Sequence, residues 1–378
     1  MQTQRKAVAL ISGGLDSLLA AKAIQDQGIH VEGLNFFTGF CVEGHTHAIR
    51  AKDRAKPKRN NALWVAEQLG IKLHIIDISE PYKDIVINPK HGYGQNLNPC
   101  LDCKIFMVNQ AKTWGFMQEH DFDFIITGEV IGQRPKSQRK ETMPIIARES
   151  GADDLLLRPL CALNLPPTRP EREGWVDRSK LFGFSGRNRK PQMALAEHYG
   201  FENYAQPAGG CCFLTDRKYS DKLADLWQAR GTREYSLDDI MLLKIGRHIR
   251  PLSPREKAGE KAGEQAQTVS QLPDPTQKQA RAGFKMIIGR EEGENAYLEG
   301  YRKQFHHLRI ESHPGPLTLI DGDPSASDLQ LAARIAARYS QGRDADQVVV
   351  AAITPAGESR QLVVQPLPPT QIPDHWHV

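Results

Sequence analysis

The chain has 378 residues, enough for two ordinary domains, and its 40% hydrophobic and 25% charged residues are typical of a soluble globular protein. No apolar run approaches the roughly 18 residues of a membrane span, and the N-terminus lacks a signal-peptide core, so we expect a cytoplasmic protein. Its six cysteines are then expected to be thiols or metal ligands. Residues 285–378 carry nine Lys or Arg against twelve Asp or Glu, a net charge of −3, which leaves +7 on residues 1–284. A mildly basic surface on residues 1–284 suits phosphate or RNA, and on charge alone it equally fits an ordinary solvated surface.

The N-terminal half alternates strand and helix patterns. Short apolar runs bounded by glycine or polar residues read as strands, and apolar residues at helical spacing that stop at Gly28 or Gly70 read as helices. The predicted strands are residues 7–11, 30–37, 71–78 and 122–127, and the predicted helices are residues 17–27 and 61–69. This alternation predicts an α/β fold with a parallel sheet and helices on both faces.

Residues 251–282 differ in composition, because they are rich in Pro, Gly, Gln and Lys and have almost no large apolar side chains. Such a segment is typical of a flexible linker. After it we predict a strand at 284–289, a helix at 328–339 and a strand at 347–353. The predicted domains are therefore an α/β domain at 1–205, an extension with a cysteine pair at 206–250, a linker at 251–283 and a small α+β domain at 284–378.

The strongest local signal is SGGLDS, residues 12–17, which follows the first predicted strand and opens the first helix. Two glycines let the backbone approach an anion, and a helix N-terminus offers free N–H groups. The hydroxyls of Ser12 and Ser17 can donate to phosphate oxygens, whereas Asp16 would repel an anion unless it held Mg²⁺ or organised the loop. Neither GxxxxGK[ST] nor GxGxxG occurs, so we expect neither a Walker loop nor a dinucleotide site.

In this context the motif resembles the PP-loop ATP pyrophosphatases, which cleave ATP between the α- and β-phosphates and form an adenylated intermediate. The resemblance implies an adenine nucleotide alpha hydrolase-like fold, ATP and Mg²⁺ as cofactors, and Asp16 as a catalytic residue. The resemblance also implies two groups of ATP-binding residues. In the glycine loop they are Ser12, Gly13, Gly14, Asp16 and Ser17, and in a second loop farther along the chain they are Thr127, Gly128, Glu129 and Gln133. The alternative is a glycine-rich turn with no ligand.

A second polar cluster, TGEVIGQRPKSQRK at residues 127–140, follows the strand predicted at 122–127. Open α/β sheets bind ligands at the C-terminal ends of parallel strands. Glu129, Gln133 and Ser137 could therefore contact nucleotide or metal. The basic side chains of the cluster are predicted to meet phosphates of RNA or nucleotide: Arg134, Lys136, Arg139 and Lys140. On the residues alone, a solvated basic loop is the alternative.

TGExxGQxxxSQ, followed by LRPL at residues 157–160, resembles the catalytic core of the tRNA 4-thiouridine synthetases over about residues 5–205. The RNA-binding domains that precede the core in that family are not found before residue 12, so RNA capture is expected elsewhere. The related tRNA 2-thiouridylases have cysteines in segments like NPCLDCK and CCFL, but usually TGH where this chain has TGE.

These resemblances imply an ATP-dependent tRNA sulfurtransferase, a transferase that adenylates a uridine carbonyl and replaces its oxygen with sulfur. The expected product is 4-thiouridine. The alternatives are a tRNA 2-thiouridylase, a PP-loop amidotransferase or ligase that uses nitrogen, and a non-catalytic RNA-binding protein.

Four cysteines fall in two pairs, Cys100 and Cys103 in a CxxC motif and Cys211 and Cys212 after two glycines. One CxxC fits redox chemistry, zinc, an iron–sulfur cluster or no function. Adjacent cysteines rarely ligate one ion together, so Cys100, Cys103 and either Cys212 or Cys211 would suit a 4Fe–4S cluster with an open position. Some thiolating PP-loop enzymes resemble this pattern and use such a cluster. Others use a persulfide, which implies Cys103 and Cys212 as the catalytic pair.

The remaining cysteines, Cys41 and Cys161, have no partner nearby in the sequence. Cysteine is among the residue types most often buried in protein cores. We therefore expect both to be ordinary buried thiols.

Residues 284–366 are similar to the RNA-binding domain of the NFACT proteins, with a strand, a turn, a helix beginning near Ser327 and a β-branched strand. The resemblance implies that RNA is captured at this end of the chain, and a packing or dimerisation domain is the alternative. The expected partners are tRNA and a sulfur donor, either sulfide or a persulfide carrier protein. A homodimer is compatible with the sequence, and no membrane is expected.

Overall fold

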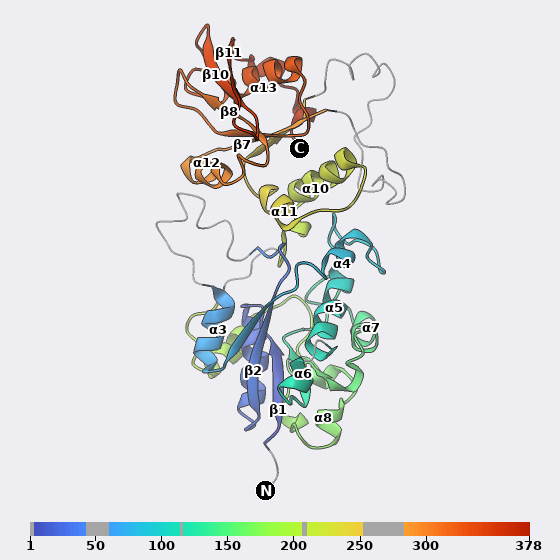
Figure 1. Ribbon diagram of the computed structural model, residues 1–378. Helices are drawn as coiled ribbons and strands as arrows, with labels where there is room; N and C mark the ends of the chain where they lie inside the picture. The colour runs from blue at the N-terminus through green and yellow to red at the C-terminus, as the bar shows by residue number, and fades with distance from the viewer. Residues whose placement is uncertain (1–3, 43–59, 114–115, 206–209, 252–282) are drawn as a thin grey trace. The chain divides into compact units, whose positions relative to one another are not determined.

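The computed structural model describes residues 4–42, 60–113, 116–205, 210–251 and 283–378 (Figure 1). The chain divides into two compact units: the N-terminal unit ends at Cys212, and the C-terminal unit runs from Phe213 to Val378. Among the described residues, none of the helices has both the length and the apolar character of a membrane span.

The N-terminal unit is built on a five-stranded parallel sheet, so the predicted α/β fold is confirmed. Its strands are β1 (Lys6–Leu10), β2 (His30–Phe37), β3 (Leu73–Asp77), β4 (Phe124–Thr127) and β5 (Leu156–Leu157), in the spatial order β3-β2-β1-β4-β5. The order reverses between β1 and β4, and the loops after these two strands therefore meet at the point where such sheets bind ligands.

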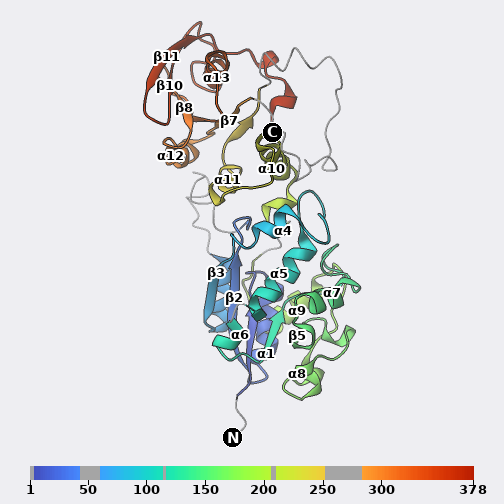
Figure 2. The same ribbon diagram turned by 45° about the vertical axis from the view of Figure 1, so that its right-hand side comes forward.

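Helices cover both faces of this sheet (Figure 2). Successive side chains of β1 point to opposite faces, so Ala7 and Ala9 enter one core and Val8 enters the other. The first core includes residues of α1 (Leu15–Gln25), α3 (Asn61–Leu69) and α9 (Lys190–His198), and the second includes residues of α5 (Cys100–Thr113) and α7 (Thr142–Glu149). Three shorter helices are α4 (Lys83–Ile87), α6 (Phe116–Glu119) and α8 (Arg169–Arg172).

The C-terminal unit contains a six-stranded antiparallel sheet with helices on both faces. The strands are β6 (Arg247–Ile249), β7 (Lys285–Ile288), β8 (His306–Ile310), β9 (Thr318–Asp321), β10 (Val348–Ile353) and β11 (Ser359–Val364), in the order β11-β10-β8-β9-β7-β6. α13 (Ala326–Arg338) packs on one face, and α12 (Glu292–Glu299) packs with α11 (Leu237–Leu242) on the other. α13 begins with a capping box of Ser325 and Asp328.

Residues 213–250 of the predicted extension belong to the C-terminal unit. β6 pairs with β7, so it joins the sheet of the C-terminal unit from across the predicted linker. In α10 (Arg217–Arg230), Asp225 accepts bonds from the guanidinium of Arg250 and lies 2.9 Å from the buried Lys285 ammonium. This buried network ties the segment to the C-terminal sheet. Of the predicted linker 251–283, residues 252–282 lie outside the described residues.

Candidate active site

The glycine loop SGGLDS lies between β1 and α1, as predicted. Gly13 has φ +80°, and a Cβ there would come within 2.7 Å of the Asn61 Cβ and 2.8 Å of the Ala62 nitrogen. Only glycine fits this backbone and this close approach to α3. Gly14 is the N-cap of α1 and supplies no side-chain cap, so the first turn of the helix retains N–H groups suited to an anion.

The two serines of the loop lie close to each other. Ser12 Oγ and Ser17 Oγ are 3.5 Å apart, and the Ser17 hydroxyl donates to the Gly14 carbonyl at 2.8 Å. Ser17 is buried, whereas Ser12 is exposed. Ser12 is therefore the more accessible of the two predicted phosphate ligands.

The loop after β4 packs directly on the start of α1. A Cβ on Gly128 would lie 2.5 Å from the carbonyl carbon and oxygen of Asp16 and 2.6 Å from the Ser17 nitrogen. Real Cβ atoms essentially never make such contacts, so glycine is required here for steric reasons. The two polar loops predicted from the sequence therefore form one site.

Asp16 is the centre of this site. Its Oδ2 accepts hydrogen bonds from Gln133 Nε2 at 2.8 Å and from Arg189 Nη2 at 3.0 Å, whereas its buried Oδ1 has no protein partner among the described residues. Sequence analysis identified Gln133 but missed Arg189, which precedes α9 and belongs to no motif. The site thus holds one carboxylate oxygen in place and leaves the other available to a cation.

Thr127 and Glu129 lie beneath the loop rather than on its surface. Both are 1% exposed, the Thr127 hydroxyl donates to Glu129 Oε2 at 3.0 Å, and Arg158 Nε donates to the same oxygen at 3.0 Å. Although burial opposes it, Lys104 and Arg158 lower the pKa of Glu129 below its ordinary value. The pair Glu129–Arg158 joins the TGE and LRPL motifs and supports the loop from inside, so the predicted contact of Thr127 and Glu129 with ATP stays a prediction.

The cysteines gather around the N-terminus of α5. Cys100 and Cys103 lie on the same face of its first turn, and the Cys100 thiol contacts Ser137 Oγ at 3.5 Å. Cys103 is hydrogen-bonded to the buried Tyr82 and interacts electrostatically with Cys211. Cys211 is in turn hydrogen-bonded to Cys212. The two pairs predicted from the sequence are therefore brought together.

Cys41 also belongs to this group, which corrects our expectation of an ordinary buried thiol. It is only half-buried, and its backbone forms an isolated antiparallel bridge with that of Cys212, while its thiol contacts the Phe36 carbonyl at 3.8 Å and Thr38 Oγ1 at 3.5 Å. Cys161, by contrast, is buried and donates its thiol hydrogen to the Glu129 carbonyl at 3.2 Å, as expected for a structural thiol. We use the term cysteine cluster for Cys41, Cys100, Cys103, Cys211 and Cys212.

The protein environment separates the thiols of the cysteine cluster by acidity. Hydrogen bonding to Cys212 and the positive charges of Arg134 and Lys104 lower the pKa of Cys211 to about 6. Burial and the neighbouring Cys211 raise the pKa of Cys103 well above its ordinary value. Cys211 is exposed, and of Cys103 and Cys211 it is the thiol that ionises at neutral pH.

This acidity can be measured by alkylation. Iodoacetamide should modify Cys211 at a rate that rises with pH around 6 and levels off near neutral pH, because the thiolate is the nucleophile. Cys161 should stay unmodified, because burial raises its pKa to about 12. Arg134→Ala should move the Cys211 profile to higher pH, because it removes a positive charge. Peptide mass mapping across the pH range measures each rate, and a Cys211 profile centred at the ordinary thiol value would contradict the assignment.

The structure does not support the predicted iron–sulfur ligands. No three Cys, His, Asp or Glu side chains of the described residues are arranged to hold a metal ion, and this includes Cys100, Cys103, Cys211 and Cys212. A 4Fe–4S cluster needs several thiolates directed at one centre. The described residues therefore do not show a cluster site, and the predicted ligands stay a prediction.

The four predicted RNA-binding side chains are all exposed: Arg134, Lys136, Arg139 and Lys140. The Lys136 amine donates to the Tyr93 carbonyl at 2.7 Å. These residues follow Gln133, which contacts Asp16, and Arg134 acts electrostatically on Cys211. One loop thus runs from the glycine loop to the cysteine cluster with its basic side chains exposed.

Comparison with known proteins agrees with this arrangement. Residues 5–151 match the tRNA methyl transferase HUP domain, and residues 279–377 match the NFACT protein RNA binding domain. The tRNA-specific 2-thiouridylase MnmA of Pectobacterium carotovorum is 27% identical over 246 residues, which cover 63% of this chain and 61% of the relative. The MnmA of Haemophilus influenzae is 28% identical over 255 residues, which cover 65% of this chain and 59% of the relative.

The chain thus spans about three fifths of the length of these curated relatives. A solved complex of a 4-thiouridine synthetase with RNA and bound ATP is 21% identical, covers 56% of this chain and 46% of that chain, and has a TM-score of 0.36. The matched regions agree with the resemblances drawn from the motifs: most of the N-terminal unit is similar to the tRNA methyl transferase HUP domain, and most of the C-terminal unit is similar to the NFACT protein RNA binding domain.

Proposed function

We propose that this protein is an ATP-dependent tRNA sulfurtransferase. One observation carries the proposal: two adjacent residues connect the glycine loop to the cysteine cluster. Gln133 donates to Asp16 of the glycine loop, and Arg134 lowers the pKa of Cys211. An enzyme that activates a base with ATP and then delivers sulfur to it needs these two sites side by side.

The relatives favour 2-thiouridine as the product over the 4-thiouridine expected from the sequence. The TGE motif led to the earlier expectation, but the curated relatives named above are 2-thiouridylases. We therefore propose thiolation at the C2 position of a uridine. The NFACT-type domain would supply the RNA capture.

In the first step, the triphosphate of ATP would bind at the glycine loop, where the N-terminus of α1 is open. The uridine carbonyl oxygen attacks the α-phosphorus, and pyrophosphate leaves with the electrons of the broken P–O bond. Exposed Arg134 and Lys136 are available to stabilise the charge of the leaving group. Activation is needed because a carbonyl oxygen is a very poor leaving group.

Asp16 is the residue that fits Mg²⁺. Its buried Oδ1 lacks a protein partner among the described residues, and carboxylate oxygen is a ligand that Mg²⁺ prefers. Mg²⁺, when bound, would neutralise part of the charge of the triphosphate. Gln133 and Arg189 hold the other oxygen, so the carboxylate keeps one orientation.

In the second step, Cys212 would carry the sulfur as a persulfide received from the donor. The terminal sulfur attacks the activated carbon, and AMP leaves with the former carbonyl oxygen and its bonding electrons. Cys103 first loses its proton, which its raised pKa makes the slow part of this step. Its thiolate then attacks the Cys212 sulfur, the S–S bond breaks, and the thiolated base leaves as a disulfide forms between the two cysteines. An external dithiol reduces that disulfide before the next cycle.

Incubation of tRNA with the protein, ATP, a persulfidated carrier protein as the sulfur donor, and a dithiol that reduces the final disulfide tests the proposal. Nucleoside mass spectrometry should detect a thiolated uridine that coelutes with 2-thiouridine, together with AMP. The omission of ATP should abolish the product. If no thiolated nucleoside forms while the protein is folded and binds tRNA, the proposal fails.

The close approach of Gly128 to α1 gives a prediction for the ATP step. Gly128→Ala should lower the rate of pyrophosphate release about 100-fold, because the new Cβ would displace the backbone of Asp16. Gly174→Ala is a useful control for loop glycines, since nothing lies within 4 Å of its Cβ position, although its φ of +67° adds strain. A Gly128→Ala variant that releases pyrophosphate at the wild-type rate would contradict the packing described here.

A further inference from the structure

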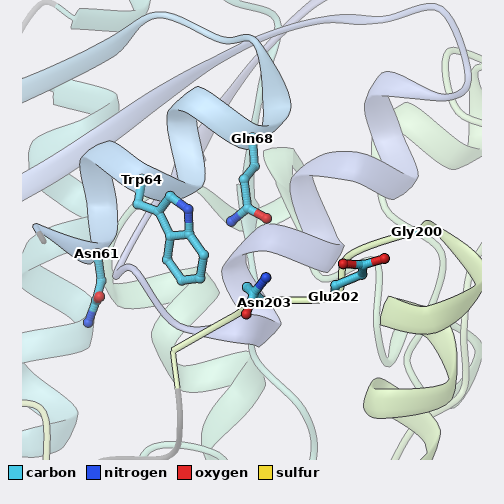
Figure 3. A pocket seen from close by; sticks show the side chains of 6 residues that line it. All are labelled: Asn61, Trp64, Gln68, Gly200, Glu202 and Asn203. Carbon is cyan, nitrogen blue, oxygen red and sulfur yellow. The ribbon is translucent and has the colours of Figure 1, made fainter.

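A cavity of about 660 Å³ lies beside α3, and none of its described lining residues belongs to the cysteine cluster (Figure 3). Trp64 and Gln68 project into it from one face of α3, and Glu202 and Asn203 lie opposite on the segment that follows α9. Asn61 and Gly200 complete its lining. Nothing in the mechanism proposed above uses this cavity.

The lining has the chemistry of a nucleobase site. Trp64 supplies a flat aromatic surface, and the side-chain amides of Asn61, Gln68 and Asn203 supply donors and acceptors. Gln68 Nε2 is buried and has no hydrogen-bond partner among the described residues, so a donor is available for a ligand carbonyl or ring nitrogen. Proteins that recognise unpaired RNA bases stack them on aromatic side chains and bond their edges in this way.

The charge of the lining argues against phosphate. The six described lining residues include no Lys or Arg, and Glu202 adds a negative charge. These described residues offer no positive charge to a phosphate, and they suit a neutral base.

The cavity adjoins the glycine loop through Asn61. The Cβ position of Gly13 lies 2.7 Å from the Asn61 Cβ, so the first residue of α3 contacts both the loop and the cavity. We propose that the cavity binds an unpaired base of the RNA substrate, next in the strand to the uridine that reacts. This inference rests on the proposed function, because it takes RNA as the substrate.

Substitution of Trp64 tests the proposal in the full-length protein. Trp64→Ala should weaken tRNA binding, measured by filter binding, about tenfold, because the stacking surface is lost. Trp64→Phe should restore most of the affinity, since it keeps an aromatic face. The slope of affinity against salt concentration should stay unchanged, because no phosphate contact is removed. The KM for ATP should also stay unchanged.

Leu63→Ala is the matched control, because Leu63 lies on the same helix and is 50% exposed but does not line the cavity. Its tRNA affinity should equal that of the wild type. The proposal is overturned if folded Trp64→Ala binds tRNA normally, if Trp64→Phe is as weak as Trp64→Ala, or if ATP affinity falls instead. If the wild-type protein binds tRNA but never thiolates it, the proposed function is refuted and the proposed base site is not, because the Trp64 variants are compared by tRNA affinity rather than by thiolation.

Discussion

Cys212→Ser should lower the rate of tRNA thiolation at least about a thousandfold while tRNA-dependent release of pyrophosphate continues. Serine has no sulfur to carry a persulfide, and it leaves the glycine loop and Asp16 unchanged. Cys212 lies between Cys211, to which it is hydrogen-bonded, and Cys41, with which it forms a backbone bridge. Pyrophosphate release and thiolated nucleoside should be measured in the same reaction, so that the two steps are separated.

Cys161→Ser is the control for this variant. The Cys161 thiol is buried outside the cysteine cluster and donates to the Glu129 carbonyl, and a serine hydroxyl can donate to the same atom. The control should therefore keep both steps. If Cys212→Ser still thiolates tRNA at an appreciable rate, Cys212 does not carry the sulfur, and another thiol of the cysteine cluster must do so.

Arg158→Met should destabilise the N-terminal unit by about 3–5 kcal/mol, because it leaves the carboxylate of Glu129 buried without its ion-pair partner. The side chains are 5% and 2% exposed, so water cannot replace the lost contact. The double variant Arg158→Met with Glu129→Gln should recover part of the loss, because it removes the unpaired charge. Urea unfolding followed by circular dichroism measures these differences.

The surface pair of Arg172 with Asp154 provides the comparison. These side chains are 49% and 56% exposed, so Arg172→Ala should cost less than about 1 kcal/mol. If Arg158→Met were no more destabilising than Arg172→Ala, the buried pair would not support the loop after β4. The double-variant result then distinguishes an unpaired charge from a simple loss of packing.

Elements with strong end signals were predicted closely. The helix at 61–69 agrees with the structure because Asn60 caps two backbone N–H groups at its start and Gly70 adopts φ +64° at its end. α5 was not predicted, because its apolar and polar residues are mixed around the helix rather than separated onto two faces. β6 was missed because it has three residues and its partner strand lies beyond the predicted linker.

The candidate site was predicted in part. Asp16, Gln133 and the two cysteine pairs stand in recognisable motifs, and the structure brings Asp16 to Gln133 and one cysteine pair to the other. Arg189 and Cys41 stand in no motif, so the sequence offered no signal for either. Packing places the Arg189 guanidinium beside Asp16 and the Cys41 backbone beside that of Cys212.

The amino-acid sequence by itself determined the first four strands of the N-terminal unit, two of its helices and the presence of a glycine loop, because these depend on short stretches of backbone preference and side-chain pattern. Only the tertiary structure decided what surrounds each reactive group. Arg189 reaches Asp16 across 173 residues, and Arg158 reaches Glu129 across 29. Contacts of this kind depend on how helices and strands pack, and packing is a property of the whole unit rather than of any local segment.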